Sequence, residues 1–293
     1  MDYHVSNQDS EVNALYKSVE ANRISNTSRS FWTTTLLAPA HSLNCQLSEI
    51  SGIKTSETLI PHTSHNSSSN KSTILLVHGG FSDGQEWDAV WPLLVAYHVL
   101  IPDLPAHGRS LETKPLEIND AARPLASLIE AKAQKQIAHV VAISIGAHVA
   151  ATMAAQYPER VQTLIVSGFN LFAPNLISPI LPYLVYAAQR TSGRSGCGHL
   201  FTTCDIFNIL FSSRDLEPIA ARSLVVAATR GISADNFSHS RRLFETVMDN
   251  ESRLVQHRGM RHPWNADEPQ LFANVVISWI MGGDLPDSFE PIP

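Results

Sequence analysis

The sequence predicts an α/β fold in which a mostly parallel central sheet has helices on both faces and carries an inserted helical cap. Two observations lead to this prediction. Short β-branched runs alternate with longer segments of helical spacing from Thr73 onward, and such alternation is typical of parallel sheets. The alternation then stops for roughly fifty residues, which is long for a plain loop, and afterwards resumes. With 44% hydrophobic and 16% charged residues, the 293-residue chain has enough apolar material for a large core.

The pattern divides the chain into three parts. Residues 1–72 are expected to form an N-terminal extension with the first strands of the sheet, since LNCQLSEI and ETLIP can pair as a hairpin. Residues 73–168 and 223–293 are expected to form the α/β core, and residues 169–222 the helical cap insertion. Because reactive residues collect at the carboxyl ends of the strands in such sheets, a cap placed there would cover the active edge.

The core begins with a strand, a helix and a second strand. TILLVHGG predicts a buried strand that ends in glycines, and EWDAVWPLLVA predicts an amphipathic helix. YHVLIPDLPAHGRS predicts a strand that runs into a loop rich in proline and glycine. Asn119 or Asp120 can cap the next helix, which continues through PLASLIEAKAQ and tolerates Pro124 near its first turn.

The remaining elements follow the same alternation. HVVAI has the length and β-branched content of a strand buried on both faces, and GAHVAATMAAQY has the small and apolar spacing of a buried helix. VQTLIVSG predicts the next strand. The cap region contains two apolar segments, NLISPILPYLVYAAQ and HLFTTCDIFNILF, separated by TSGRSGCG. Strand SLVVAAT, helix HSRRLFETVMD, strand SRLVQH and helix DEPQLFANVVISWIM complete the core.

Composition and charge argue against several classes of function. A net charge of −6 and a pI near 6.1 leave no basic surface for a nucleic-acid backbone. No window reaches the roughly 18 to 20 apolar residues that a membrane span needs, so we expect a cytoplasmic protein. The three cysteines show no C-x-x-C pattern, which argues against a zinc site and a disulfide framework. We expect a small-molecule substrate, no cofactor and no metal, and the sequence leaves open whether the chain forms a homodimer.

Ser144 lies between the strand HVVAI and the helix that follows it. Only one residue separates it from Gly146, so the chain must turn sharply, and such a turn lifts one side chain out of the sheet. A serine hydroxyl becomes a nucleophile when an imidazole accepts its proton and a third group holds the imidazole. His262, after the strand SRLVQH, and Asp235, after SLVVAA, lie at the same predicted edge of the sheet. The order Ser, Asp, His is the one that this topology imposes on a triad.

Four motifs carry a resemblance to a known family. They are HGGF at residues 78–81, DLPAHGRS at residues 103–110, AISIG around Ser144, and GMRHPWNADEPQLFANVVISWI near the end of the chain. Through them the chain resembles the α/β-hydrolase superfamily, in its subset of capped serine hydrolases. The motifs look like the oxyanion loop, the D-x-x-G/A-H-G-x-S loop, the nucleophile elbow and the terminal histidine loop of that superfamily. Fungal members are also similar in the Asp-Asn pair that begins at Asp235 and in a short proline-bearing tail.

The resemblance implies a role for each candidate site residue. Ser144 would be the nucleophile, His262 the general base and Asp235 the acid that steadies the imidazolium. The superfamily also implies an oxyanion hole, built from the backbone N–H of Ile145 and an N–H from Gly80 or Phe81, the last two in the HGGF loop.

Two features depart from the pattern of the superfamily. Ala142 stands where the G-x-S-x-G elbow usually begins with glycine, and alanine is the next smallest residue, so we expect the elbow to form. Asp235 comes later after its strand than the usual acid, so its loop must curl back, and Asp205 and Asp215 are reserve candidates. Ser144 and Asp235 could alternatively serve only as helix caps.

Three further histidines have structural explanations. His78 and His107 lie in loops whose glycines make the turns, and we expect both to order those loops. His148 lies on the first turn of the buried helix and is expected to be a hydrogen-bonded core histidine.

The leading functional hypothesis is a serine hydrolase that cleaves an ester, lactone or thioester of a small, fairly apolar metabolite through an acyl-enzyme. The apolar cap segments motivate the substrate class. One alternative keeps the triad but hydrolyses a C–C bond or releases a biosynthetic chain by cyclisation, as in secondary metabolism. Another is a non-catalytic ligand receptor, because one fold can host several functions.

Overall fold

A computed structural model describes residues 59–113, 116–172, 176–192, 200–211, 215–231 and 234–292. The hairpin expected between LNCQLSEI and ETLIP lies almost wholly outside the described residues. No helix in the described ranges is both long and apolar enough to cross a membrane.

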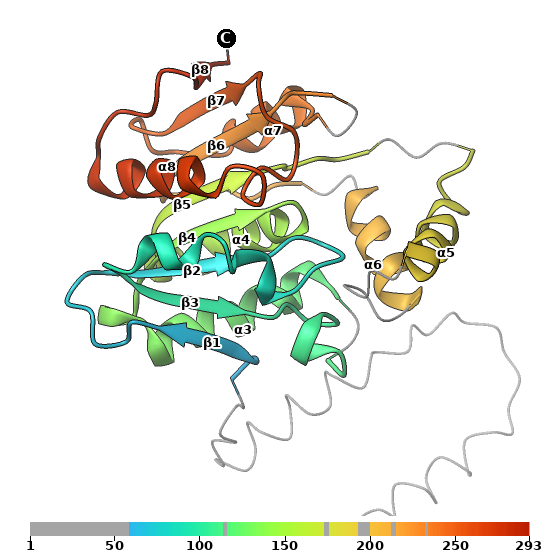
Figure 1. The fold of residues 1–293 in the computed structure, drawn as a ribbon, viewed down its shortest axis with the longest axis horizontal. Helices are drawn as coiled ribbons and strands as arrows, with labels where there is room; N and C mark the ends of the chain where they lie inside the picture. The colour runs from blue at the N-terminus through green and yellow to red at the C-terminus, as the bar shows by residue number, and fades with distance from the viewer. Residues whose placement is uncertain are drawn as a thin grey trace, which may run out of the picture. The chain divides into compact units, whose positions relative to one another are not determined.

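The described chain forms a sheet with the strand order β1-β3-β2-β4-β5-β6-β7-β8 (Figure 1). The six strands from β2 to β7 run parallel to their neighbours, and β1 and β8 add to the two edges in the antiparallel sense. This arrangement confirms the predicted fold class. The strands are β1 (His62–His65), β2 (Thr73–Val77), β3 (His98–Pro102), β4 (Ala138–Ile143), β5 (Val161–Ser167), β6 (Arg222–Ala228), β7 (Arg253–His257) and β8 (Glu290–Pro291).

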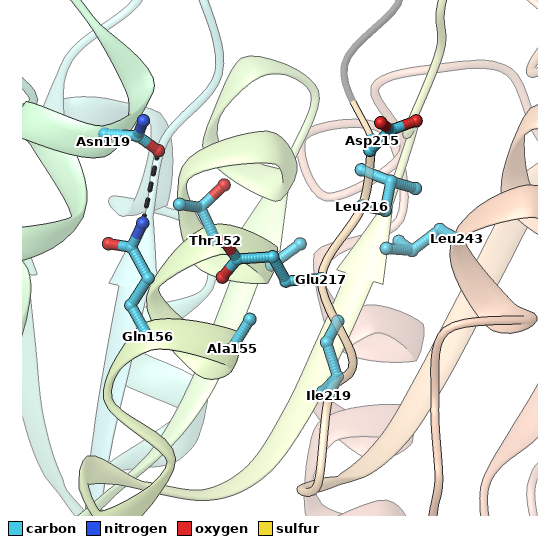
Figure 2. A pocket seen from close by; sticks show the side chains of 10 residues that line it. Asn119, Thr152, Ala155, Gln156, Asp215, Leu216, Glu217, Ile219 and Leu243 are labelled. Atoms are coloured by element: carbon cyan, nitrogen blue, oxygen red, sulfur yellow. Dashed lines mark hydrogen bonds between the residues drawn. The ribbon is translucent and has the colours of Figure 1, made fainter.

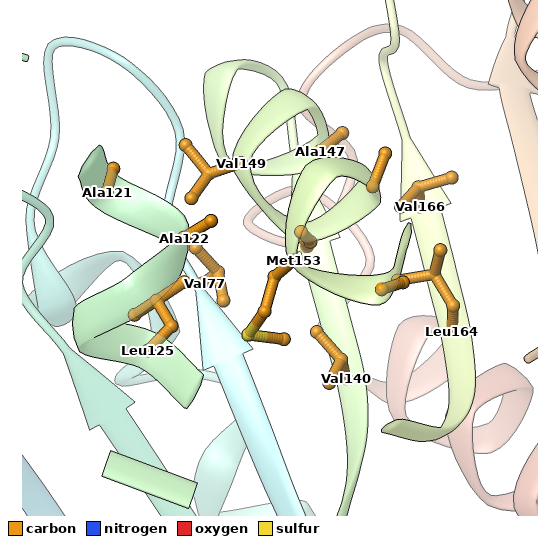
Figure 3. Packing of buried hydrophobic residues seen from close by; sticks show 14 of the residues in the cluster. Val77, Ala121, Ala122, Leu125, Val140, Ala147, Val149, Met153, Leu164 and Val166 are labelled. Carbon is orange, nitrogen blue, oxygen red and sulfur yellow. The ribbon is translucent and has the colours of Figure 1, made fainter. Parts of the chain in front are cut away.

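Helices cover both faces of the sheet. One buried cluster joins the sheet to α3, α4 and α7, and the other joins it to α8 and two short 3-10 helices, η1 and η2. In Figure 3, Met153 of α4 lies over Val140 of β4, between the side chains of Leu125 and Leu164. The helices are η1 (Gly84–Trp87), η2 (Trp91–Leu94), η3 (Gly108–Ser110), α3 (Ile118–Lys132), η4 (Gln134–Gln136), α4 (Ile145–Gln156), η5 (Pro158–Arg160), α5 (Leu181–Ser192), α6 (Leu200–Leu210), α7 (Phe237–Phe244) and α8 (Pro269–Met281).

The prediction of one amphipathic helix over EWDAVWPLLVA is wrong, because two 3-10 helices, η1 and η2, form there instead. Pro92 lies in the first turn of η2 and has no N–H to continue an α-helix from η1. The apolar spacing was nevertheless informative. Trp87, Val90 and Leu94 are all fully buried in the cluster beneath α8.

Two helix boundaries also differ from the sequence prediction. α3 begins at Ile118, so Asn119 and Asp120 lie inside it and Pro124 falls in its second turn. The burial of Ile118 with the helix explains the earlier start, since apolar packing there outweighs a polar cap. α7 ends at Phe244 instead of continuing through Asp249.

α5 and α6 stand between β5 and β6 in the chain, where the cap was expected, and Figure 1 shows them beyond the carboxyl ends of the parallel strands. α6 contacts the loops at that edge. The Thr202 hydroxyl donates to the Ala106 carbonyl at 3.3 Å, and the Ile206 side chain packs against Gly80. The helical insertion therefore reaches the edge that carries the candidate site.

Candidate active site

Ser144 occupies a strained turn between β4 and α4. Its backbone has φ 54° and ψ −125°, a conformation that an L-residue adopts at a cost of about 1–3 kcal/mol and keeps only where its surroundings enforce it. Those surroundings are close. A Cβ on Gly146 would lie within 2.8 Å of the Val77 carbonyl oxygen and nearer still to that of His78, so only glycine fits there. Ala142 is buried on β4 and pairs with Val77 of β2 and with β5, so alanine at the first elbow position is compatible with the sheet.

The Ser144 side chain does not cap α4. It makes no capping hydrogen bond although it precedes the first helical residue, Ile145. The simple explanation of a serine at a helix start is therefore excluded, because an N-cap accepts from a backbone N–H of the first turn.

The Asp235 loop curls back to the end of its strand, as its late position required. The Asp235 N–H donates to the Ala228 carbonyl at 2.8 Å, and the Ala228 N–H donates to Asp235 Oδ2 at 2.8 Å. Asn170, which follows β5, holds the same loop twice. Its amide donates to Asp235 Oδ1 at 3.0 Å, and its oxygen accepts from the Asn236 N–H at 2.8 Å. Asn236, not Asp235, caps α7 by accepting from Ser238.

His262 faces the Asp235 carboxylate. Its Nδ1 lies 3.6 Å from Asp235 Oδ1, which is within ion-pair distance but longer than a hydrogen bond. Burial lowers the pKa of His262 below its ordinary value, and the Asp235 carboxylate opposes that change. Burial also raises the pKa of Asp235, against the effects of His262 and of hydrogen bonds from Ala228, Asn170 and Gly168.

Ser167, at the end of β5, connects the nucleophile turn to the histidine loop. Its carbonyl accepts the Ser144 N–H at 2.9 Å, and its hydroxyl accepts the indole N–H of Trp264 at 2.9 Å. The next residue, Gly168, has φ +72°, and the imidazole of His262 lies directly over it. The structure thus brings Ser144, His262 and Asp235 to one edge of the sheet.

The HGGF loop also reaches this edge. A Cβ on Gly79 would lie 3.2 Å from the Ser144 Cβ, and one on Gly80 would meet the side chain of Ile206 at 3.2 Å. Phe81 has φ 64°, a left-handed conformation that is uncommon for an aromatic residue. With Ile145 as the first residue of α4, all three candidate oxyanion residues lie in the segments next to Ser144.

The two loop histidines order their loops, as predicted. His78 Nε2 accepts the Leu104 N–H at 2.9 Å, so Nδ1 carries the proton and donates to the Gly79 carbonyl at 2.7 Å. Burial, with the nearby His107, lowers the pKa of His78 to about 3. His107 Nδ1 bonds to the Pro105 carbonyl at 2.9 Å.

The core role predicted for His148 also holds. Its Nε2 lies 3.1 Å from the Asn170 carbonyl oxygen, and its ring stacks on Phe169 with centroids 4.1 Å apart.

The reserve acids make other contacts. Asp205 on α6 accepts the Leu116 N–H at 3.1 Å, and Asp235 is the carboxylate that acts on the pKa of His262. Asp215 lines a cavity of about 270 Å³ on the outer side of α4, where Figure 2 also shows Asn119 bonded to Gln156 at 3.3 Å. None of the candidate triad residues lines this cavity.

Within the described ranges, no group of three or more His, Cys, Asp or Glu side chains could hold a metal ion.

Comparison with known proteins fixes the family. A family model described as the alpha/beta hydrolase fold matches residues 72–193. A Gibberella zeae protein named AB hydrolase superfamily protein is 56% identical over 253 residues, which cover 81% of this chain and 89% of that protein. The chain belongs to the α/β-hydrolase superfamily. The predicted resemblance, including its fungal side, is confirmed.

Solved structures share the fold of this hydrolase. The enol-lactonase from Burkholderia xenovorans matches with a TM-score of 0.58 and 18% identity, over 75% of this chain and 96% of that one. A thermophilic esterase from Thermogutta terrifontis matches with a TM-score of 0.60 and 17% identity, over 76% of this chain and 93% of that one. At these identities the likeness concerns the fold alone.

Sequence reasoning missed the residues that hold the site together. Asn170 bonds to the candidate acid Asp235, which lies 65 positions away in the chain. Ser167 bonds to Trp264 of the histidine loop, 97 positions away. Glu86 was missed as well, although its carboxylate accepts the Gly79 N–H at 2.7 Å. No local pattern marks such residues, because their partners are brought close only by the fold.

Proposed function

We propose that this protein is a serine hydrolase that forms an acyl-enzyme on Ser144, with His262 as general base and Asp235 as the orienting acid. The observation that carries the proposal is the Ser144 turn. Its backbone is strained, and its hydroxyl makes no cap, so a conformation that costs free energy serves no structural hydrogen bond. The approach of His262 Nδ1 to within 3.6 Å of a buried carboxylate supports it.

The proposed reaction has two steps. His262 accepts the Ser144 hydroxyl proton as the oxygen bonds to the substrate carbonyl carbon, and it then returns the proton to the leaving alcohol or thiol as that bond breaks. The N–H of Ile145 and that of Gly80 or Phe81 stabilise the oxyanion, and one such donor is typically worth about 3–4 kcal/mol of barrier. A water then gives its proton to His262 and attacks the acyl carbon. As the bond from that carbon to Ser144 Oγ breaks, His262 returns the proton to Oγ, which releases the acid and restores Ser144.

The charge states near pH 7 suit these roles. Because burial lowers the pKa of His262, the imidazole is neutral at that pH and can accept a proton. Asp235 accepts hydrogen bonds from Ala228 and Asn170, and these favour its ionised form against the desolvation that raises its pKa.

The substrate is proposed to be a small, fairly apolar ester, lactone or thioester. Apolar groups surround the oxyanion loop, where Ile206 packs on Gly80 and the rings of Phe81 and Phe207 have centroids 6.3 Å apart. The insertion adds further apolar residues that lie at least half exposed, Leu176, Ile177, Ile180, Tyr183 and Leu184. The names of the two solved relatives justify testing both esters and lactones.

A fluorophosphonate probe tests the proposal, because it labels only activated serines. The full-length protein should be labelled, and the Ser144→Ala variant should not, while Ser67→Ala, which alters an exposed loop serine, should be labelled like the parent. Labelling of Ser144→Ala at the parental rate would refute the proposal. A panel of short-chain esters, lactones and thioesters then identifies the bond class. Turnover in ¹⁸O-water separates hydrolysis from intramolecular release, since only hydrolysis puts the label into the product.

A further inference from the structure

Glu86 sits beside the candidate oxyanion loop although it is eight residues from the HGGF histidine in the chain. It lies on η1, and its Oε2 accepts the Gly79 N–H at 2.7 Å, a short charge-assisted hydrogen bond. A Cβ on Gly79 would lie 3.6 Å from this Oε2 and 3.2 Å from the Ser144 Cβ. The Gly79 residue is therefore in contact with the Glu86 carboxylate and with the nucleophile turn at the same time.

The Glu86 carboxylate is held beside this loop in a partly buried position. Burial, the largest effect, raises its pKa, and the hydrogen bond from the Gly79 N–H opposes that change. One side chain of η1 thus bonds directly to the loop that would carry the oxyanion donors.

The bond to Gly79 has a consequence for the oxyanion hole. Because the Gly79 N–H is occupied by Glu86, this peptide is fixed, and the next two N–H groups, of Gly80 and Phe81, are the ones left for a substrate. The left-handed φ of 64° at Phe81 directly follows this fixed segment. A shift of the Gly79 peptide would change the direction of both remaining donors.

We propose that Glu86 is a positioning residue that holds the oxyanion loop beside the Ser144 turn through its hydrogen bond to Gly79. The inference rests on the proposed function, since an oxyanion hole has meaning only if Ser144 attacks a carbonyl. Glu86 itself touches no reacting atom. Removing a carboxylate from water costs free energy. The strong hydrogen bond between Glu86 and the oxyanion loop explains why an acid is found at this position.

The test compares Glu86→Ala and Glu86→Gln with the parent protein. Short-chain p-nitrophenyl esters give kcat and KM, and an arylboronic acid, which adds to an active serine and mimics the tetrahedral intermediate, gives Ki. Displacing a donor by about 1 Å can cost on the order of a hundredfold in rate, so we expect Glu86→Ala to lower kcat by about tenfold to a hundredfold. Glu86→Gln keeps an acceptor but loses the charge, and its kcat should fall by about threefold to tenfold. KM should change little in both, and Ki should rise in parallel with the loss of kcat.

Asp83→Ala is the matched control. Asp83 begins the same 3-10 helix and accepts the Gln85 N–H at 2.9 Å, but its side chain does not bond to Gly79. It should lower thermal stability slightly and leave kcat and Ki unchanged. A purely structural role for Glu86 would lower the active fraction and leave Ki untouched, and that result would overturn the inference. If Glu86→Ala does not fold, an unchanged Ki in Glu86→Gln overturns it equally.

The proposed function fails separately. If the parent protein is neither labelled by a fluorophosphonate nor inhibited by the boronic acid, the serine hydrolase assignment is wrong and the inference falls with it. If the parent is labelled and inhibited but both Glu86 variants match it in kcat and Ki, only the role of Glu86 is wrong.

Discussion

Gly168→Ala should damage catalysis far more than it damages stability. Gly168 follows β5 with φ +72°, and a Cβ added there would overlap Nδ1 and Cε1 of His262 and lie 3.0 Å from Nε2. Gly282, at the end of α8, has the same φ of +72° but nothing within 4 Å of the position of an added Cβ. The two glycines therefore share the same positive φ, and only Gly168 lies against the imidazole.

The expected magnitudes separate the two effects. A left-handed L-residue costs about 1–2 kcal/mol, and this term applies to Gly168→Ala and Gly282→Ala alike. For a domain of this size, each kcal/mol lowers Tm by about 2–4 °C. In Gly168→Ala the imidazole must also move by more than about 1 Å to reach ordinary contact, and a shift of about 1 Å can already cost about a hundredfold in rate. That loss corresponds to about 2.7 kcal/mol of barrier.

Thermal unfolding and the rate of fluorophosphonate labelling measure the two terms on the same samples. We expect both variants to unfold a few degrees below the parent, which follows from the shared backbone cost. Only Gly168→Ala should lose about two orders of magnitude in labelling rate, and Gly282→Ala should match the parent. If Gly168→Ala is labelled within threefold of Gly282→Ala, the imidazole over Gly168 is not the catalytic base, and the reasoning from geometry to rate fails.

Three further predictions concern the surroundings of the site. Asn170→Ala should lower kcat by about tenfold with a small fall in Tm, because Asp235 loses one of the groups that hold it, and Asn170→Asp should lower kcat further through charge repulsion. Burial lowers the pKa of His139 to about 4 in the folded state. Its contribution to the free energy of unfolding is therefore fully present above the unfolded pKa of 6.5 and is lost as pH falls from 6.5 to 4. Urea unfolding should show a loss of up to about 3 kcal/mol over this range, and His139→Gln should remove that pH dependence. Burial raises the pKa of Asp103, but the hydrogen bonds from Arg109 and Gly84 together outweigh it and lower the pKa overall. The contribution of Asp103 to the free energy of unfolding is therefore present above pH 3.8 and is lost on acidification below that value. In Asp103→Asn, the free energy of unfolding should depend less on pH in this range.

The sequence was most informative where structure depends on neighbouring residues. The parallel strands from β2 to β7 were predicted from their own apolar runs, since a strand buried on both faces is apolar along most of its length. The elbow at Ser144 could be predicted for the same reason, because a glycine two residues later is required by the contact with the carbonyl oxygens of β2. The prediction of a helix after the HGGF loop was wrong. The apolar spacing of Trp87, Val90 and Leu94 correctly indicated burial, but it does not determine which backbone hydrogen bonds form.

The supports of the site could not be predicted in this way. Asn170, Ser167 and Glu86 are ordinary polar residues in sequence, and their roles arise from contacts that the sheet order creates. The late position of Asp235 was visible in the sequence, but the means of correcting it was not. The loop returns to the end of β6 because Asp235 bonds to Ala228 through both its backbone and its side chain. These two bonds place the carboxylate where an acid directly after the strand would lie.

These contacts explain how the strain at Ser144 persists. A left-handed serine costs about 1–3 kcal/mol, and an isolated turn would relax to avoid it. Here the flanking β4 and the first turns of α4 are almost fully buried, and moving them would expose apolar groups worth about 1.5–3 kcal/mol for each large side chain. The Ser144 N–H is also fixed to Ser167, and Ser167 holds Trp264 of the histidine loop. Relaxing the turn would thus disturb the candidate base together with the nucleophile, so the core that stabilises the fold also enforces the geometry of the site.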